Sequence, residues 1–146
     1  MTTKNKVRAG ALLALGALAA GRFALAADTP KKPELRGYCP AAYGLVAKAI
    51  KGDPKYPSVH NGRLYYLANA DAKKAFDANP EKFTIAYDGW CTTGVALGKK
   101  LESDPTLFII HSGVTHLFSS ADAKKAFEGD PEGMLANAEA NWPRLK

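Results

Sequence analysis

The chain has 146 residues, and its 20 Lys and Arg against 14 Asp and Glu give a formal net charge of +6. Lys4, Lys6, Arg8 and Arg22 lie in the first 26 residues, so the rest carries 16 basic and 14 acidic residues, a net charge of +2. Its lysine pairs lie beside acidic residues, which is typical of solvated helix faces, and no nucleic-acid partner is expected.

Residues 1–26 have the features of a secretory signal peptide. Three basic residues precede an apolar run that leads to Ala24-Leu25-Ala26, a small-x-small cleavage site. The run is shorter than the ~20 residues of a membrane-spanning helix. We therefore expect a periplasmic or secreted protein that is soluble after cleavage and has no stable membrane insertion. Residues 27–36, with two prolines and paired lysines, predict a flexible lead.

The remaining segment, residues 37–146, contains an internal repeat. Residues 60–83 align with residues 111–134 at an offset of 51, with 11 of 24 positions identical. Gly37-Tyr38-Cys39 aligns with Gly89-Trp90-Cys91 at an offset of 52, so each copy has one cysteine at an equivalent position. We divide the domain into repeats 37–86 and 87–146, each a supersecondary unit that buries its apolar face against its twin.

Each repeat predicts the same elements in the same order. A short helix is expected after each cysteine, over residues 40–50 and 92–101. An antiparallel hairpin follows, with strands 56–60 and 63–67 around Asn61-Gly62, and strands 106–111 and 114–118 around Ser112-Gly113. A helix then begins after Asn69 or Ser120 as N-cap.

These helices present one aromatic residue each to the core, Phe76 and Phe127. They end before Asn79-Pro80 and Asp130-Pro131, where a new N-cap and a proline at the first helical position start another helix. The second of these helices is expected to reach about residue 140. The fold class is α+β: two hairpin-plus-helix units around a shared core, with both hairpins in one antiparallel sheet.

Cys39 and Cys91 are the leading candidates for chemistry. Copies of a duplicated unit usually pack about a pseudo-twofold axis, which would bring the two sulfurs together. In an oxidising compartment they would form a disulfide; reduced, two thiolates suit Cu(I) better than Zn(II). A disulfide, a metal site and unpaired thiols therefore all stay open.

The histidines are weaker candidates. His60 and His111 each precede a hairpin turn, where a side chain most often faces water. His116 takes the place of Tyr65 on the second strand, as a partly buried sheet residue or as a third ligand near Cys91. The thioredoxin, haem, nucleophile-elbow, zincin and phosphate-loop motifs are absent from the sequence, so no enzyme is expected.

Three motifs resemble those of bacterial exported YHS-domain proteins. These are residues 87–98 (YDGWCTTGVALG), Asp104-Pro105, and the closing residues 140–143 (ANWP). The family has a recurring cysteine that Cys91 matches, whereas Cys39 stands where many members have aspartate. The resemblance implies metal handling beside copper and heavy-metal transport or resistance proteins.

The sequence thus predicts an exported module that binds a soft metal ion, copper above all, through Cys39 and Cys91 with His116 as an auxiliary ligand. The alternative is a non-catalytic structural or interaction domain stapled by a Cys39–Cys91 disulfide.

Overall fold

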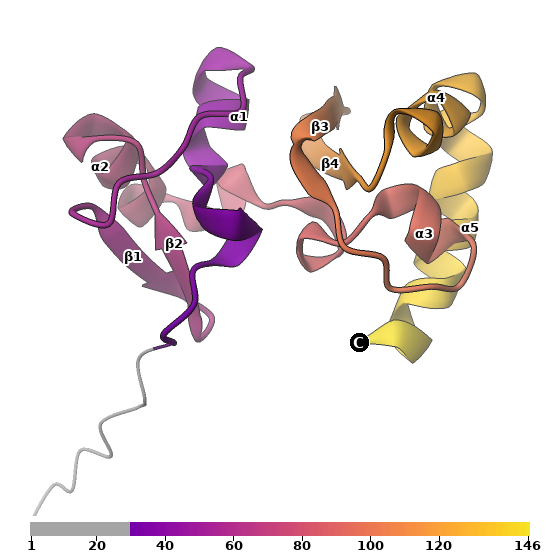
Figure 1. Cartoon of the computed structure of the whole chain (residues 1–146), viewed down its shortest axis with the longest axis horizontal. Helices are drawn as coiled ribbons and strands as arrows, with labels where there is room; N and C mark the ends of the chain where they lie inside the picture. The colour runs from indigo at the N-terminus through magenta and orange to yellow at the C-terminus, as the bar shows by residue number, and fades with distance from the viewer. Residues whose placement is uncertain (1–29) are drawn as a thin grey trace, which may run out of the picture.

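The computed structural model describes residues 30–146, which form an α+β protein with two antiparallel hairpins (Figure 1). The first half contains η1 (Glu34–Gly37), α1 (Pro40–Val46), β1 (Pro57–His60), β2 (Arg63–Tyr66), α2 (Ala70–Ala78) and η2 (Pro80–Phe83). The second half contains η3 (Ala86–Gly89), α3 (Thr92–Ala96), β3 (Asp104–His111), β4 (Val114–Phe118), α4 (Ala121–Gly129) and α5 (Pro131–Leu145). The predicted signal peptide and the start of the lead lie outside the described residues. No helix within residues 30–146 is both long and apolar enough to cross a membrane.

The two hairpins are confirmed, and their turn residues explain them. Asn61 and Gly62 have φ values of 50° and 74°, and Ser112 and Gly113 have values of 50° and 79°. Two successive residues with positive φ give the turn twist that matches a right-handed pair of strands. The pairings His60–Arg63 and His111–Val114 therefore close the two hairpins at equivalent positions.

The helix starts are also confirmed. Side-chain oxygens of Asn69 and Ser120 accept hydrogen bonds from the backbone N–H groups of Ala72 and Ala123, and each satisfies a donor that the first helical turn leaves free. Phe76 and Phe127, at equivalent places in α2 and α4, are almost fully buried. Helix α5 starts at Pro131 as predicted but extends to Leu145, past the expected end near residue 140.

The single antiparallel sheet predicted for both hairpins is wrong. The strands form two separate two-stranded sheets, β1–β2 and β3–β4. The free edge of β2 is bridged by Pro33, and the free edge of β4 is bridged by Ile85 and Cys91. The segment that enters each half thus occupies the edge of its second strand, so β2 and β4 cannot pair with each other through these edges. Residues 33–36 of the lead, which was predicted to be flexible, are likewise part of the fold.

The buried apolar residues form four clusters. One cluster, around Leu67 and Phe76, belongs to the first half alone. Two others, around Phe127 and around Val95, belong to the second half alone. A fourth cluster joins the halves, and we call it the seam: Tyr43, Ile85 and Leu117, with Leu35, Ala49 and Phe108 packed against them.

The halves pack head to tail, not about a twofold axis. Figure 1 shows the order across the molecule: hairpin β1–β2, then α1, hairpin β3–β4, α3 and finally α5. Helix α1 packs through Tyr43 on the second hairpin, whereas Val95, the equivalent residue of α3, packs against Ala138 of α5. Each half therefore uses a different surface at the contact, and α5 covers the face of α3 that a further hairpin would otherwise cover.

Tyr43 makes the most specific contacts of the seam. Its side chain is fully buried, its ring meets Phe108 edge to face at 5.0 Å, and its hydroxyl donates a 2.7 Å hydrogen bond to the carbonyl of Pro105. Burial raises the pKa of the Tyr43 hydroxyl, so it stays protonated and keeps donating. The ion pair Arg36–Glu102, also between the halves, is largely exposed and contributes little.

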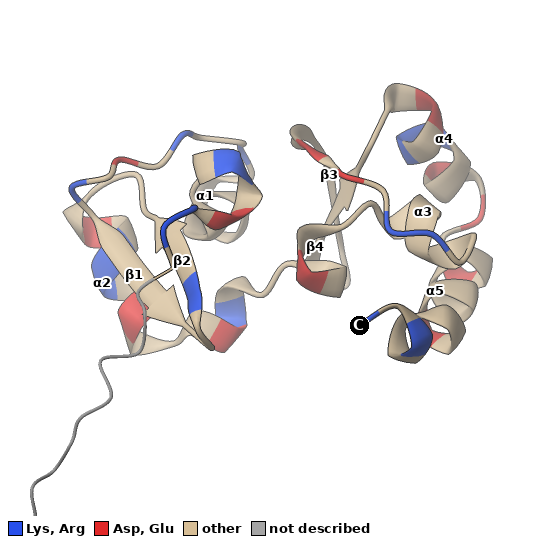
Figure 2. Ribbon diagram, turned by 60° about the horizontal axis from the view of Figure 1, so that its bottom comes forward, with Lys and Arg blue, Asp and Glu red and all other residues tan. Residues whose placement is uncertain are grey.

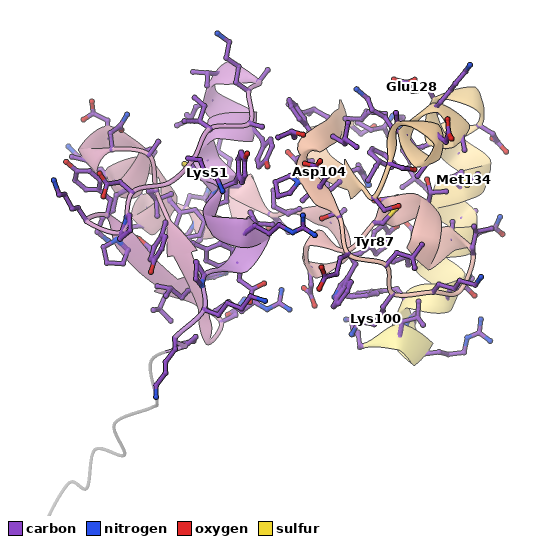
Figure 3. All side chains as sticks on the ribbon, in the orientation of Figure 1. Lys51, Tyr87, Lys100, Asp104, Glu128 and Met134 are labelled. Carbon is purple, nitrogen blue, oxygen red and sulfur yellow. The ribbon has the colours of Figure 1, made fainter. Side chains whose placement is uncertain are left out.

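Charge is distributed over both halves. Lys and Arg are interspersed with Asp and Glu along the described chain, as Figure 2 shows. Asp104, labelled in Figure 3, lies on the side of the second half that faces the first.

Tyr43→Phe tests the seam. The substitution leaves the Pro105 carbonyl without its donor in a buried place, so we expect a loss of about 1–2 kcal/mol of unfolding free energy in urea titrations. Tyr38→Phe is the matched control, since the Tyr38 hydroxyl makes no hydrogen bond within residues 30–146 and its ring contact with Lys51 survives. Equal losses of unfolding free energy in the two variants would contradict the role of the Tyr43 hydroxyl in the seam.

Candidate functional site

The two cysteines are not brought together. Both are fully buried (0% exposed) and precede a helix as its N-cap residue, Cys39 for α1 and Cys91 for α3. Cys39 packs in the core of the first half with Leu67 and Phe76. Cys91 packs in the second half with Phe118 and Phe127.

In the described chain both cysteines are free thiols, so the predicted Cys39–Cys91 disulfide is wrong. The physical reason is the head-to-tail packing: equivalent residues of the halves face different neighbours and have no common axis at which to meet. The sulfur of Cys91 instead accepts a 3.4 Å hydrogen bond from the backbone N–H of Gly94, in the first turn of α3. Each cysteine acts locally, as a small apolar group at a helix start.

His116 is a buried residue of β4 whose side chain contacts the start of α3. It is 4% exposed, its ring stacks on Phe127 at 5.4 Å, and its Nδ1 shares a 3.1 Å hydrogen bond with the hydroxyl of Thr92. Burial, with a smaller contribution from nearby His111, lowers the pKa of His116 from 6.5 to about 4. The imidazole is therefore neutral at pH 7.

The other ring nitrogen of His116, Nε2, has no hydrogen-bonding partner among the described residues. Every polar side-chain atom in residues 30–146 that is fully buried has a hydrogen-bonding partner. Because Nε2 has none, it is not fully buried and must reach open space. That space is a pocket of about 440 Å³ that His116 lines. We call it the second-half pocket; it is lined by Ala86, Tyr87, His111, Ser112, Val114, His116, Glu132, Leu135, Glu139 and Trp142.

One face of α5 forms a wall of this pocket. Glu132, Leu135, Glu139 and Trp142 follow each other at intervals of three or four residues, which places them on one side of the helix. The adjacent face holds α5 in place, because the side-chain amide of Asn141 donates to the carbonyls of Val95 and Ala96 at 3.1 and 3.0 Å. The closing motif ANWP thus contributes one residue that anchors α5 to α3 and one that lines the pocket.

Two further contacts define the chemistry of the pocket. Nε2 of His111 lies 3.2 Å from a carboxylate oxygen of Glu132. Tyr87 meets Trp142 edge to face at 5.6 Å, and burial together with the nearby Glu139 raises the pKa of Tyr87. Among the residues that the structure describes, the lining contains two carboxylates and no Lys or Arg.

The first half has a pocket of about 300 Å³ at the equivalent place. There His60 lies 2.9 Å from Glu81, and Tyr65 occupies the position of His116 against Phe76. Arg63 also lines it and pairs with Asp88 at 3.0 Å. The lining of the first-half pocket thus contains one arginine and three carboxylates, those of Glu34, Glu81 and Asp88. Among the described residues, the second-half pocket contains two carboxylates, no Lys or Arg, and two imidazoles.

Sequence reasoning missed the His–Glu pairs. His60 and His111 were expected to face water, but their side chains are only 28% and 29% exposed, and both contact a glutamate. The signal was present, because each histidine precedes its glutamate by 21 residues in both repeats. No group of three or more His, Cys, Asp or Glu within residues 30–146 is arranged to hold a metal ion.

Comparisons of the chain with protein-family models, with curated proteins and with solved structures find no match in any of the three.

The burial of both thiols predicts their reactivity. In native protein neither should react with a thiol reagent, because attack requires an accessible thiolate. After denaturation without reductant, we expect two thiols per chain, and one in Cys39→Ser or in Cys91→Ser. A count near zero in the denatured protein would mean that the cysteines are paired.

The low pKa of His116 predicts how stability depends on pH. Below pH 6.5 the unfolded chain binds a proton at this residue and the folded chain does not, so the unfolding free energy falls from pH 6.5 to about pH 4. The expected loss is on the order of 3 kcal/mol. His116→Tyr, the residue of the first half, should flatten this part of the profile, while His60→Asn should keep it. Both variants keep the other titratable groups of the second-half pocket, so the contributions of these groups to the pH dependence cancel in the comparison; the groups are Tyr87, His111, Glu132 and Glu139. Identical pH profiles of the two variants would contradict a buried neutral His116.

Proposed function

We propose that this protein is an exported, non-catalytic module that binds a small cation in its second-half pocket. The observation that carries the proposal is the unpartnered Nε2 of His116, a neutral nitrogen of a buried residue that opens into a pocket with two carboxylates. With no Lys or Arg in the described lining, the pocket attracts positive charge. A positively charged ligand would complete the hydrogen bonding of His116.

The proposal includes an internal duplication. It is supported by equivalent contacts in the two halves, where the backbone N–H of Cys39 donates to Ile50 and that of Cys91 donates to Leu101. The pairs of left-handed residues in η1 and η3, Leu35-Arg36 and Tyr87-Asp88, also correspond. We infer that the halves descend from one unit of the YHS type and that α5 and His116 distinguish the second one.

The soft-metal function predicted from the cysteines takes a different form in this proposal. A copper ion held by Cys39, Cys91 and His116 would need sulfurs from two separate cores. Because no three such groups within residues 30–146 are arranged around one point, a metal ion in the second-half pocket would have to draw His111, His116 and Glu132 together. Imidazole with carboxylate suits Zn(II) or Cu(II) better than Cu(I). Export to the periplasm and transfer of the ion to a metal-transport or resistance protein belong to this form of the proposal.

The absence of catalysis is also proposed. A nucleophile needs a base that activates it and a partner that orients the base. Ser112 in the pocket is exposed at a hairpin turn, and the sulfur of Cys91 lies in the core with the N–H of Gly94 as its neighbour. These positions support a role in binding.

Cation binding is tested by histidine-detected NMR of the purified protein, with ZnCl₂, CuCl₂ and butylammonium chloride added separately. We expect at least one of them to shift the His111 and His116 signals saturably, and Glu132→Gln to weaken that binding about tenfold. Glu81→Gln is the matched control, because Glu81 contacts His60 in the first-half pocket. Shifts of equal size at both pockets, or none at His111 and His116, would refute a cation site in the second half.

A further inference from the structure

We infer that the cation bound in the second-half pocket is a small free aliphatic amine, held as its ammonium form. The inference rests on the proposed function and names the ligand class of the same site. It is drawn from the spacing of the two imidazoles, from the shape of the wall that α5 provides, and from the aromatic rings at its far end.

The spacing of the histidines suits an ammonium group better than a metal ion. The ring centres of His111 and His116 are 6.5 Å apart. Two imidazoles on one zinc ion have centres about 5.2 Å apart, since Zn–N bonds are about 2.0 Å long and meet at a tetrahedral angle. At 6.5 Å the two rings are too far apart to share one such ion, whereas an ammonium group can bind a single imidazole and a carboxylate.

The hydrogen-bond acceptors of the pocket also suit an ammonium group. Glu132 lies beside His111 and is 85% exposed in its side chain, so its carboxylate can turn toward a ligand at the pocket mouth. Nε2 of His116 is the second contact, and in the tautomer that leaves it unprotonated it accepts an N–H from the ligand. An ammonium group has three such donors, and the carboxylate and the imidazole satisfy two of them.

The pocket extends along α5 away from this end. Glu139 lies seven residues after Glu132, which is about 10 Å along the helix, and Trp142 lies about 15 Å along it. Between the carboxylates the wall is formed by Leu135, and Tyr87 also lines the pocket. An alkyl chain fits such a wall, and a second ammonium group at its other end meets Glu139.

Two lysines limit where a positively charged group of the ligand can bind. The ammonium groups of Lys100 and Lys146 lie 5.9 Å from the centre of the Trp142 ring. The rings thus already accept cations of this chemistry, but the charge of these lysines disfavours another ammonium group directly at Trp142. The ligand's charged groups therefore belong near Glu132 and Glu139, with its carbon chain between them.

The test titrates the protein separately with 1,4-diaminobutane, with N-acetyl-lysine amide and with ZnCl₂, and follows the signals of His111 and His116. We expect 1,4-diaminobutane to bind saturably and about tenfold more weakly to Glu132→Gln and to Glu139→Gln. Both glutamates are exposed, so the variants should fold. Glu81→Gln again serves as the unaffected control.

The remaining outcomes separate this inference from the proposed function. If only ZnCl₂ binds, the inference that the ligand is an amine is wrong, but the proposal of a cation site in the second half still holds. Binding of N-acetyl-lysine amide without 1,4-diaminobutane would identify the ligand as a lysine side chain of a partner and overturn the free amine. Binding of none of the three, and of neither CuCl₂ nor butylammonium, would remove the cation site itself.

Discussion

The packing of Tyr43 between the two halves is the contact on which the rest of the structure depends. It brings α1 against the second hairpin through an aromatic contact and a buried hydrogen bond to Pro105. Because Val95 of α3 has no such partner in the first half, the halves cannot pack symmetrically, and α5 covers the exposed side of α3 instead. The separation of Cys39 and Cys91 follows from this asymmetry.

The same asymmetry gives the second half a pocket of its own. In the first half the segment after Pro80 is a short 3₁₀ turn, whereas after Pro131 the chain continues as the 15-residue helix α5. Asn141 anchors that helix to the end of α3, and the face beside it adds Glu139 and Trp142 to the pocket. The two halves, which are similar in sequence, thus differ in the lining of their pockets. Among the described residues, one pocket contains the Arg63–Asp88 ion pair, and the other contains two carboxylates and no Lys or Arg.

Local features were predictable from the sequence, and the features that depend on packing were not. Asn61-Gly62, the caps Asn69 and Ser120, and the buried Phe76 and Phe127 follow from turn, capping and periodicity rules that act over a few residues. The relation between the halves depends on whether one helix carries Tyr or Val at a single equivalent position, and no periodic pattern expresses that difference. The sequence indicates His116 as a candidate ligand. That its imidazole is neutral and that its Nε2 lacks a partner in the described chain follow only from its burial beside Thr92 and Phe127.

The most direct test of the head-to-tail arrangement is a set of nuclear Overhauser contacts measured on the protein in solution. We predict contacts from the Tyr43 ring to the Phe108 ring, and contacts from the Val95 methyl groups to Ala138. Contacts from Val95 to Pro54, or to Pro57 of the first hairpin, would indicate a twofold arrangement. That result would contradict the separation of the cysteines and the second-half pocket together.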